Sequence, residues 1–231
     1  MQGDCAVIQI DATGCACNSV SFKSLLCLIL LDGLYKLGAG KTGINILKNN
    51  NLRFKLRNET QEAHNRLDAA LVAHDLTTIS GLRAYLCVHF LAGTHMQNLL
   101  CGYDFLRDDA EKLACLRADF EIMGGTPPSW PDAPRAKECH AVGLIYVMAG
   151  SALGSKLLYK TWRTASDDDV LSVHNFMTYA KDSKIWHKFL DYTENTLFSE
   201  SEVESMVEAA NYCFGIFEAA NNQVLKGLRD V

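Results

Sequence analysis

Helix-breaking residues are scarce over most of this chain. All four prolines lie between residues 127 and 134, and proline is the residue that most strongly interrupts a helix. Nothing breaks a helix in that way over residues 52–124 or 135–231. Strand-like alternation of apolar and polar residues between turn signals is also missing. We therefore predict an all-α fold, a bundle of roughly six to eight helices with one long proline-rich loop.

The chain also has no surplus of basic residues. Lysine and arginine together number 22, against 27 aspartates and glutamates, which gives a net charge of −5. A protein that binds nucleic acid in general needs positive charge to neutralise the phosphates. The composition therefore argues against nucleic acid as a partner.

Paired cysteine motifs are absent as well. The nine cysteines are odd in number and no two are spaced as C-x-x-C, so neither a disulfide framework nor a zinc site is indicated. The apolar run Leu25–Leu31 is far shorter than the roughly 18 residues that a transmembrane helix needs. No basic stretch opens the chain and no small-residue cleavage site follows that run closely, so a signal peptide is not indicated. We expect a soluble, cytoplasmic protein with no membrane partner.

The first fifty residues differ in character from the rest. They hold four of the nine cysteines and end in a glycine-rich stretch. The triplet at 40–42, Gly-Lys-Thr, resembles the end of a phosphate-binding loop, but Tyr35 stands where that motif has its first glycine, so we reject this interpretation. We predict an N-terminal extension of unknown structure over residues 1–50 and a helical domain over 51–231.

Several segments have a clear helical period. Apolar residues recur every three or four positions over residues 203–224, and Ser199 with Glu202 forms a capping box just ahead of them. Two further helices are marked by residues 186–190 and by residues 85–96. These patterns support the all-α prediction.

Residues 143–162, GLIYVMAGSALGSKLLYKTW, are the most informative segment. They are typical of a helix, yet Gly150 and Gly154 stand in its interior, and each interior glycine costs a helix about 1 kcal/mol relative to alanine. Glycine is tolerated at such positions where something large must lie against bare backbone. That object is either a second helix or a planar ligand, and this segment alone does not distinguish them. The segment ends in Lys156 and Lys160, which share a helix face.

Residues 53–71, RFKLRNETQEAHNRLDAAL, are typical of a second helix. His64 shares a face with Leu67 and Leu71, so its imidazole points toward apolar surroundings. Arg57 lies two turns earlier on nearly the same face, about 10.5 Å along the helix. Such a stripe fits a metal-bearing ring with acidic side groups, in which the imidazole binds the metal and the cation meets the carboxylates. A buried histidine that donates to a backbone carbonyl is the alternative.

The two helices together resemble those of one family. ETQEAHNRLD, residues 59–68, resembles the proximal-histidine helix of haem oxygenases. GLIYVMAGSALGSKLLYK, residues 143–160, resembles the distal helix of the bacterial members, where a pattern like LY-x-x-E-G-S-x-L-G is usual. The stretches at 119–143 and 181–192 are also similar to parts of that subfamily, so the resemblance runs from about Leu52 to Leu228.

The resemblance implies a fold and an activity. The fold is a multi-helix bundle that holds haem between a proximal and a kinked distal helix. The activity is oxidative cleavage of the haem macrocycle to biliverdin, CO and ferrous iron. Haem is both cofactor and substrate, O₂ is consumed, and electrons come from an external reductase or ferredoxin, because the chain has no flavin or nicotinamide motif.

The resemblance also implies residue roles. His64 is the axial iron ligand, and Gly150 and Gly154 let the distal backbone approach the haem face. Ser151 lies beside the ligand pocket and Tyr146 near it. Two cations are expected to face the haem propionates, Arg57 and Lys160.

Three positions depart from patterns in the family. Ser151 stands where animal members have an aspartate that holds distal water, although bacterial relatives also have serine there. Ala149 replaces the glutamate usual before the first glycine, which removes a supporting polar contact. Ser155 replaces a small glycine or alanine, which narrows the space above the ring. The departures at Ala149 and Ser155 bear on turnover more than on haem binding, so the first alternative is a haem carrier or sensor of the same fold.

Three further alternatives keep the helical fold but not the haem. A carboxylate-bridged di-iron protein needs Glu-x-x-His pairs, and no glutamate of this chain has a histidine three residues later. A helical thiamin-pyrimidine hydrolase needs a pocket cysteine, for which Cys87 and Cys139 are candidates that no spacing supports. The last alternative is a haem-free helical interaction protein.

Overall fold

A computed structural model describes residues 50–100, 103 and 109–229 of the chain. These residues form eight α-helices, one short 3₁₀ helix and connecting loops, with no strand among them. The elements in chain order are α2 (Asn50–Leu71), α3 (Ile79–Gln97), η1 (Asn98–Leu100), α4 (Asp109–Ile122), α5 (Ala141–Ala165), α6 (Asp168–Ser172), α7 (Asn175–Asp182), α8 (Ile185–Asn195) and α9 (Glu200–Arg229). The predicted all-α class is confirmed for this part of the chain.

The predicted helices lie where the sequence pattern places them. The helix expected over 53–71 is α2, and the glycine-containing helix is α5. The capping box forms at the start of α9, where the Ser199 backbone N–H donates to Glu202 Oε2 at 2.7 Å and the Glu202 N–H donates to Ser199 Oγ at 3.3 Å. The prolines lie in the loop of residues 123–140, between α4 and α5. Residues 1–49 of the extension predicted over 1–50, with the rejected phosphate-loop triplet, lie outside the described residues, and Asn50 is the first residue of α2.

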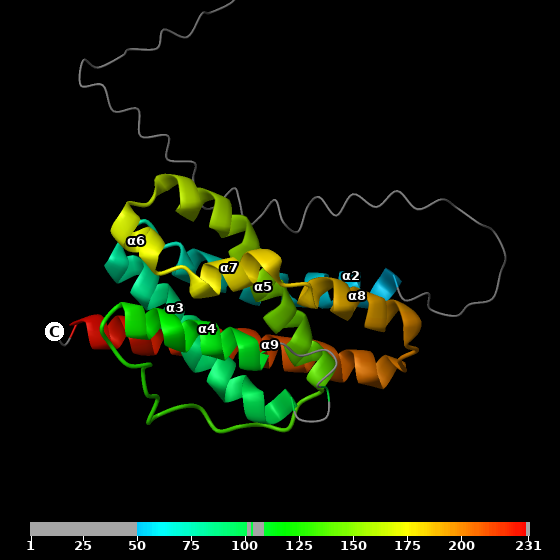
Figure 1. Cartoon of the computed structure of the whole chain (residues 1–231). Helices are drawn as coiled ribbons and strands as arrows, with labels where there is room; N and C mark the ends of the chain where they lie inside the picture. The colour runs from blue at the N-terminus through cyan, green and yellow to red at the C-terminus, as the bar shows by residue number, and fades with distance from the viewer. Residues whose placement is uncertain (1–49, 101–102, 104–108, 230–231) are drawn as a thin grey trace, which may run out of the picture.

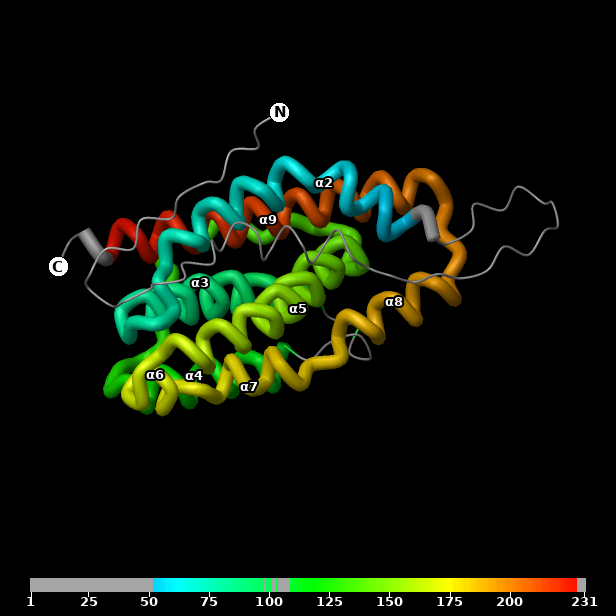
Figure 2. The backbone as a smooth tube through the Cα atoms, turned by 90° about the horizontal axis from the view of Figure 1, so that it is seen from above, coloured from blue at the N-terminus to red at the C-terminus, as the bar shows by residue number. Residues whose placement is uncertain are grey.

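The longest helix, α9, organises the bundle. It packs against α2, α3 and α5, and Figure 2 shows α2 and α9 running side by side with α5 crossing beneath them. On its other side α5 contacts α7 and α8, while α4 lies against α3 and α7. The axis of α5 changes direction between its first and second halves (Figure 1). Because α5 contacts α9, α7 and α8, it is the central helix of the bundle.

The start of α7 is fixed by a buried carboxylate on α4. Asp119 is completely buried; its Oδ1 accepts from the backbone N–H of Asn175 at 2.9 Å and its Oδ2 from that of Phe176 at 2.8 Å. These bonds satisfy two of the backbone donors that the first turn of a helix leaves free. They also hold the Phe176 ring in the interior, against Tyr85 and His89 of α3.

Two apolar clusters form the core. One joins α2, α5 and α9 and includes Leu56, Val142 and Phe217. The other joins α3, α4 and the second half of α5 with α7, and includes Phe120 and Trp162. The two clusters meet along α5, which therefore borders both.

One helix of the described residues, α5, is long and apolar enough to cross a membrane. Within its most apolar window, however, 67% is buried inside the protein. The core helix of a helical bundle has the same length and composition, so the apolar character of α5 is explained by its central position.

Candidate haem-binding cavity

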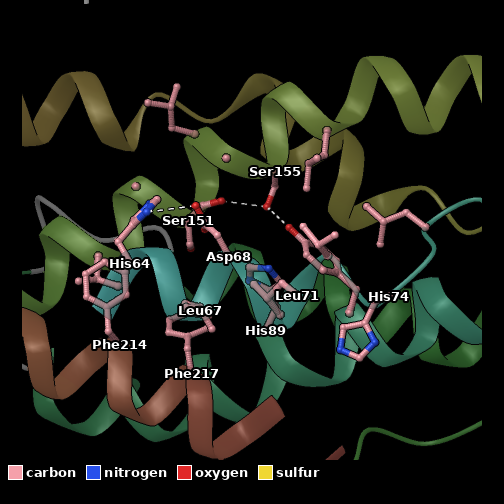
Figure 3. Close-up of a pocket in the computed structure, with 18 of the residues that line it drawn as sticks. His64, Leu67, Asp68, Leu71, His74, His89, Ser151, Ser155, Phe214 and Phe217 are labelled. Atoms are coloured by element: carbon pink, nitrogen blue, oxygen red, sulfur yellow. Dashed lines mark hydrogen bonds and ion pairs between the residues drawn. The ribbon is translucent and has the colours of Figure 1, made fainter. Parts of the chain in front are cut away.

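A largely apolar cavity lies where the two core clusters meet (Figure 3). Its walls come from α2, α3, α5, α8 and α9. The space not filled by atoms is about 970 Å³, including the part that is open to solvent. Several of the residues predicted to form a site line it: His64, Tyr146, Gly150, Ser151 and Gly154.

His64 enters the cavity from α2. Leu67 and Leu71 line the same wall, as the shared helix face predicts. The His64 side chain is 21% exposed, so this end of the cavity communicates with solvent. The ring stands edge-on to Phe214 of α9, with centroids 5.6 Å apart, which limits how the imidazole can turn.

Asp68 lies one helical turn beyond His64. Its Oδ2 is 3.1 Å from His64 Nδ1, a close approach that lacks the alignment of a good hydrogen bond. A carboxylate beside Nδ1 favours the tautomer with the proton on that nitrogen, which leaves the lone pair on Nε2. Metal-binding histidines in proteins commonly have such a carboxylate partner. The pair is therefore suited to present Nε2 to a metal.

The glycines of α5 have two different structural roles. A Cβ added at Gly143 would overlap the Met206 carbonyl oxygen of α9 and lie 2.9 Å from the Ala209 Cβ, so Gly143 permits close helix packing. A Cβ at Gly150 or Gly154 would meet nothing within 4 Å, and both residues line the cavity. These two glycines therefore leave a strip of bare backbone that faces open space.

Polar groups on α5 lie next to this strip. Ser151 Oγ donates to the Met148 carbonyl oxygen at 2.8 Å. Ser155 Oγ donates to the Ser151 carbonyl oxygen at 2.9 Å and lies 2.9 Å from the Tyr85 hydroxyl. The Ser155 hydroxyl is therefore held against the helix and against α3. Ala149 is completely buried.

Tyr146 lies at the end of the cavity nearer the start of α5. Its ring packs at 6.0 Å from Trp186, which also lines the cavity. Burial raises the pKa of Tyr146, while a hydrogen bond with Thr60 and the positive charges of Arg57 and Arg53 act in the opposite direction. Arg57 thus lies close enough to act on this hydroxyl.

The predicted rim cations are not part of the cavity wall. Arg57 is half-buried on α2, and Lys156 and Lys160 are exposed on α5. None of the three lines the cavity. The predicted contact of Arg57 and Lys160 with acidic groups of a ligand stays a prediction.

Three residues that line the cavity were missed from the sequence: Asp68, Tyr85 and His89. Lys112, which is 3.5 Å from Ser151 of the wall, was missed as well. Asp68 could have been found from its spacing, four residues after His64 on the same helix face. Tyr85 and His89 share the apolar face of α3 and pass for core residues, with 4% and 2% exposure. Burial raises the pKa of Tyr85 to about 12, so its hydroxyl is neutral.

Two of the alternatives, the di-iron protein and the thiamin-pyrimidine hydrolase, have no matching site among the described residues. No group of three or more histidine, cysteine, aspartate or glutamate side chains could hold a metal ion there. Cys87 lines a separate groove together with Pro128 and Gly227, and burial raises the pKa of its thiol to about 11. Cys139 precedes α5 and does not line the cavity either.

The residues present fit a flat metal-bearing ring. One wall supplies an imidazole with a carboxylate partner, and α5 supplies bare backbone at two glycines where side chains would otherwise fill the space. Leucine, valine and phenylalanine side chains make up much of the remaining wall, as a macrocycle requires. His64 would hold the metal and Gly150 and Gly154 would lie against the ring.

The chain matches no protein-family model and no curated protein sequence. Among solved structures it is similar to the haem oxygenase of Neisseria meningitidis, determined with NO and with CO bound. The TM-score is 0.61 at 12% sequence identity, over 75% of this chain and 91% of that chain. The similarity shows that this chain has a haem oxygenase-like, all-helical fold.

Proposed function

We propose that this protein is a haem oxygenase, which binds haem in the cavity between α2 and α5 and cleaves it to biliverdin, CO and ferrous iron. One observation carries the proposal: the His64–Asp68 pair and the bare backbone at Gly150 and Gly154 line one apolar cavity. Bound haem would supply the iron that activates O₂ and would itself be the ring that is oxidised. Electrons would come from a reductase or ferredoxin.

The protein's own residues would position and enclose the ring. His64 would ligate the iron through Nε2, while Asp68 holds the proton on Nδ1. Gly150 and Gly154 would let the ring lie against backbone, which leaves little room above it and restricts the angle at which a small ligand binds. Ser151 would lie beside that ligand, and Arg57 with Lys160 would meet the propionates at the solvent-facing edge.

A haem carrier or sensor of the same fold is the second candidate. Two features favour it: Ala149 stands where bacterial haem oxygenases usually have a glutamate, and the Ser155 hydroxyl is occupied by Tyr85 and the Ser151 carbonyl. Neither feature affects ligation by His64. The two candidates therefore predict the same haem binding and different fates of the bound haem.

Haem titration of the purified full-length chain tests the proposal. We expect the wild-type protein to form a one-to-one complex with an intense haem absorption band, and His64→Ala to lose it or bind far more weakly. His187→Ala is the matched control, because His187 is exposed on α8. Added imidazole should restore the spectrum of His64→Ala, since it can occupy the space that the side chain leaves.

Turnover then separates the two candidates. With a reductant and air, an oxygenase converts the haem band to that of biliverdin, and CO is released. A haem band that persists under these conditions would favour the carrier. A wild-type protein that binds no haem, or one whose haem complex is the same without His64, would overturn the assignment.

A further inference from the structure

A second groove lies away from the proposed haem cavity, at the end of the bundle where α3 begins and α9 ends (Figure 2). The space in it that is not filled by atoms is about 1210 Å³, including the part that is open to solvent. One wall is α3, where lining residues recur at positions 80, 83, 84, 87 and 91. This spacing puts them on one face of the helix. From Ile79 to Leu91 that face extends over about 18 Å.

The remaining walls come from α9 and from the proline-rich loop. The lining residues there are Gln223, Val224, Gly227, Pro128 and Ser129. Most of the surface that the groove exposes is apolar. An apolar groove with a few polar groups is typical of a site for a small ligand.

Arg83 is the only charged residue among the described residues that line this groove. It is half-buried, and its Nη2 donates to the Met123 carbonyl oxygen at 2.7 Å. No carboxylate of the described part of the chain forms an ion pair with it. A guanidinium has five N–H donors in a planar fork. Most of these donors are therefore available to a ligand or to water.

The turn that ends α4 fixes the position of this guanidinium. Gly124 has a φ of +68°, in the left-handed region that favours glycine. The next backbone N–H, that of Gly125, donates to the Phe120 carbonyl oxygen at 2.9 Å. A Cβ at Gly125 would lie 2.9 Å from Arg83 Nη1, so glycine lets the guanidinium lie against the turn. The Arg83 side chain is thus held by backbone, and no carboxylate cancels its charge.

We propose that this groove binds a carboxylate with a long apolar chain, such as a fatty acid, with the carboxylate on Arg83 and the chain between α3 and α9. Arginine presents two N–H groups side by side, the arrangement that a carboxylate accepts best. The apolar walls match an acyl chain, whose burial is favourable in proportion to its area. The inference does not depend on the proposed function, because the groove and the haem cavity share no lining residue.

Titration calorimetry of the full-length chain with laurate, a saturated fatty acid, tests this site. We expect one-to-one binding of laurate and much weaker binding of dodecanol and dodecyltrimethylammonium, which have the same chain without the negative charge. Arg83→Met should lower laurate affinity roughly tenfold or more, because the carboxylate loses charge-assisted hydrogen bonds. Arg83→Lys keeps the charge and should lose less. Arg163→Met is the matched control, because Arg163 is exposed on α5 and does not line the groove.

A pair of glycines on α9 tests the apolar part of the groove. A Cβ at Gly227 or at Gly215 would meet nothing within 4 Å, so a side chain at either position does not clash with backbone. Gly227 lines the groove and Gly215 does not. Gly227→Phe should therefore weaken laurate binding roughly tenfold or more, while Gly215→Phe leaves it unchanged. This pair decides the question if Arg83→Met does not fold.

Cys87 reports where laurate binds. Its thiol lines the groove, and burial raises its pKa to about 11, so the thiol is neutral and is alkylated slowly. Bound laurate should slow the alkylation of Cys87 by iodoacetamide further, as followed by peptide mass spectrometry. Cys115 on α4 does not line the groove, so its alkylation should not change.

Three results would overturn the proposal. A full-length chain that does not bind laurate would mean that the groove is closed in solution, by another part of the chain or by a second copy. Equal affinity for laurate and dodecyltrimethylammonium would mean that Arg83 does not select a carboxylate. Laurate that haem displaces, with no effect of Arg83→Met or Gly227→Phe, would mean that laurate binds in the haem cavity instead.

Discussion

Replacing the two cavity glycines of α5 with alanine should stabilise the ligand-free protein. Gly150→Ala and Gly154→Ala add a methyl group where nothing lies within 4 Å, so neither substitution clashes with the protein. Each gains the intrinsic helix preference of alanine over glycine, about 1 kcal/mol. The double variant should be more stable by about 2 kcal/mol, which for a chain of 231 residues raises Tm by roughly 4–8 °C.

Gly143→Ala is the matched control on the same helix. Its methyl group would overlap the Met206 carbonyl oxygen and lie 2.9 Å from the Ala209 Cβ. The same gain in helix preference is then outweighed by overpacking, which typically costs about 1–3 kcal/mol and is larger where backbone must move. We expect Gly143→Ala to lower the free energy of unfolding although it carries the same chemical change.

The same alanine substitutions at Gly150 and Gly154 should weaken haem binding while they raise stability. A methyl group on the bare strip holds a flat ring away from the backbone, and a steric cost of about 1–3 kcal/mol per site weakens haem binding roughly 5- to 150-fold. The measurements are urea denaturation of the haem-free protein and haem titration by absorbance. Together they should give a double variant that is more stable and binds haem more weakly.

Two results would refute this reasoning. A double variant that is less stable than wild type without haem would mean that the space beside Gly150 and Gly154 is filled in solution. A more stable variant that binds haem with unchanged affinity would mean that the ring does not lie against these glycines. Either result removes α5 as the wall that faces the macrocycle.

Two further predictions concern the other walls of the cavity. Asp68→Asn removes the carboxylate beside His64 Nδ1 and should weaken haem binding roughly 10- to 100-fold. We expect little change in Tm, because Asp68 is partly exposed. Unchanged affinity in a haem titration would contradict a role for Asp68 as the partner of His64. His89→Leu should stabilise the haem-free protein by about 1–3 kcal/mol at pH 7, because it removes a buried imidazole without a hydrogen-bond partner. The pKa of folded His89 is lowered, so below about pH 6.5 the unfolded chain binds one more proton and wild-type stability falls by up to about 1.4 kcal/mol per pH unit. His89→Leu lacks this loss, so its advantage in urea denaturation should grow from pH 7 to pH 5; a constant difference would mean that His89 is not held neutral.

Much of the fold was predictable because its determinants are local. The confinement of proline to residues 127–134 and the capping box at Ser199 gave the long loop and the start of α9. The face that His64 shares with Leu67 and Leu71 follows from the 3.6-residue period of a single helix. These features need no knowledge of how one helix meets another.

The roles of the α5 glycines were not predictable in the same way. Gly143 and Gly150 stand in similar sequence surroundings, and both fit a small-residue packing stripe. Residues seven apart lie on nearly the same face of a helix, yet a Cβ at Gly143 would meet α9 and a Cβ at Gly150 would meet open space. The difference depends on where along α5 the helix α9 packs, which the sequence does not show.

The polar groups at the inner end of the cavity were hidden for a related reason. His89 lies among apolar residues of α3, and Lys112 belongs to α4, whose sequence has no pattern that sets this lysine apart. Only the packing of α3, α4 and α5 places Lys112 near both Ser151 and His89. A polar cluster assembled from three helices leaves no spacing in the sequence that would reveal it.

The choice between an oxygenase and a carrier depends on α5 and the inner end of the cavity more than on His64. An axial imidazole with a carboxylate partner serves a protein that stores haem as well as one that cleaves it. Cleavage needs, in addition, a small ligand held in one orientation on the opposite face, and that requires a donor or a positive charge aimed at it. At that end of the cavity, both ring nitrogens of His89 lack a hydrogen-bond partner among the described residues. The fate of bound haem, rather than its binding, is therefore the measurement that distinguishes the two candidates.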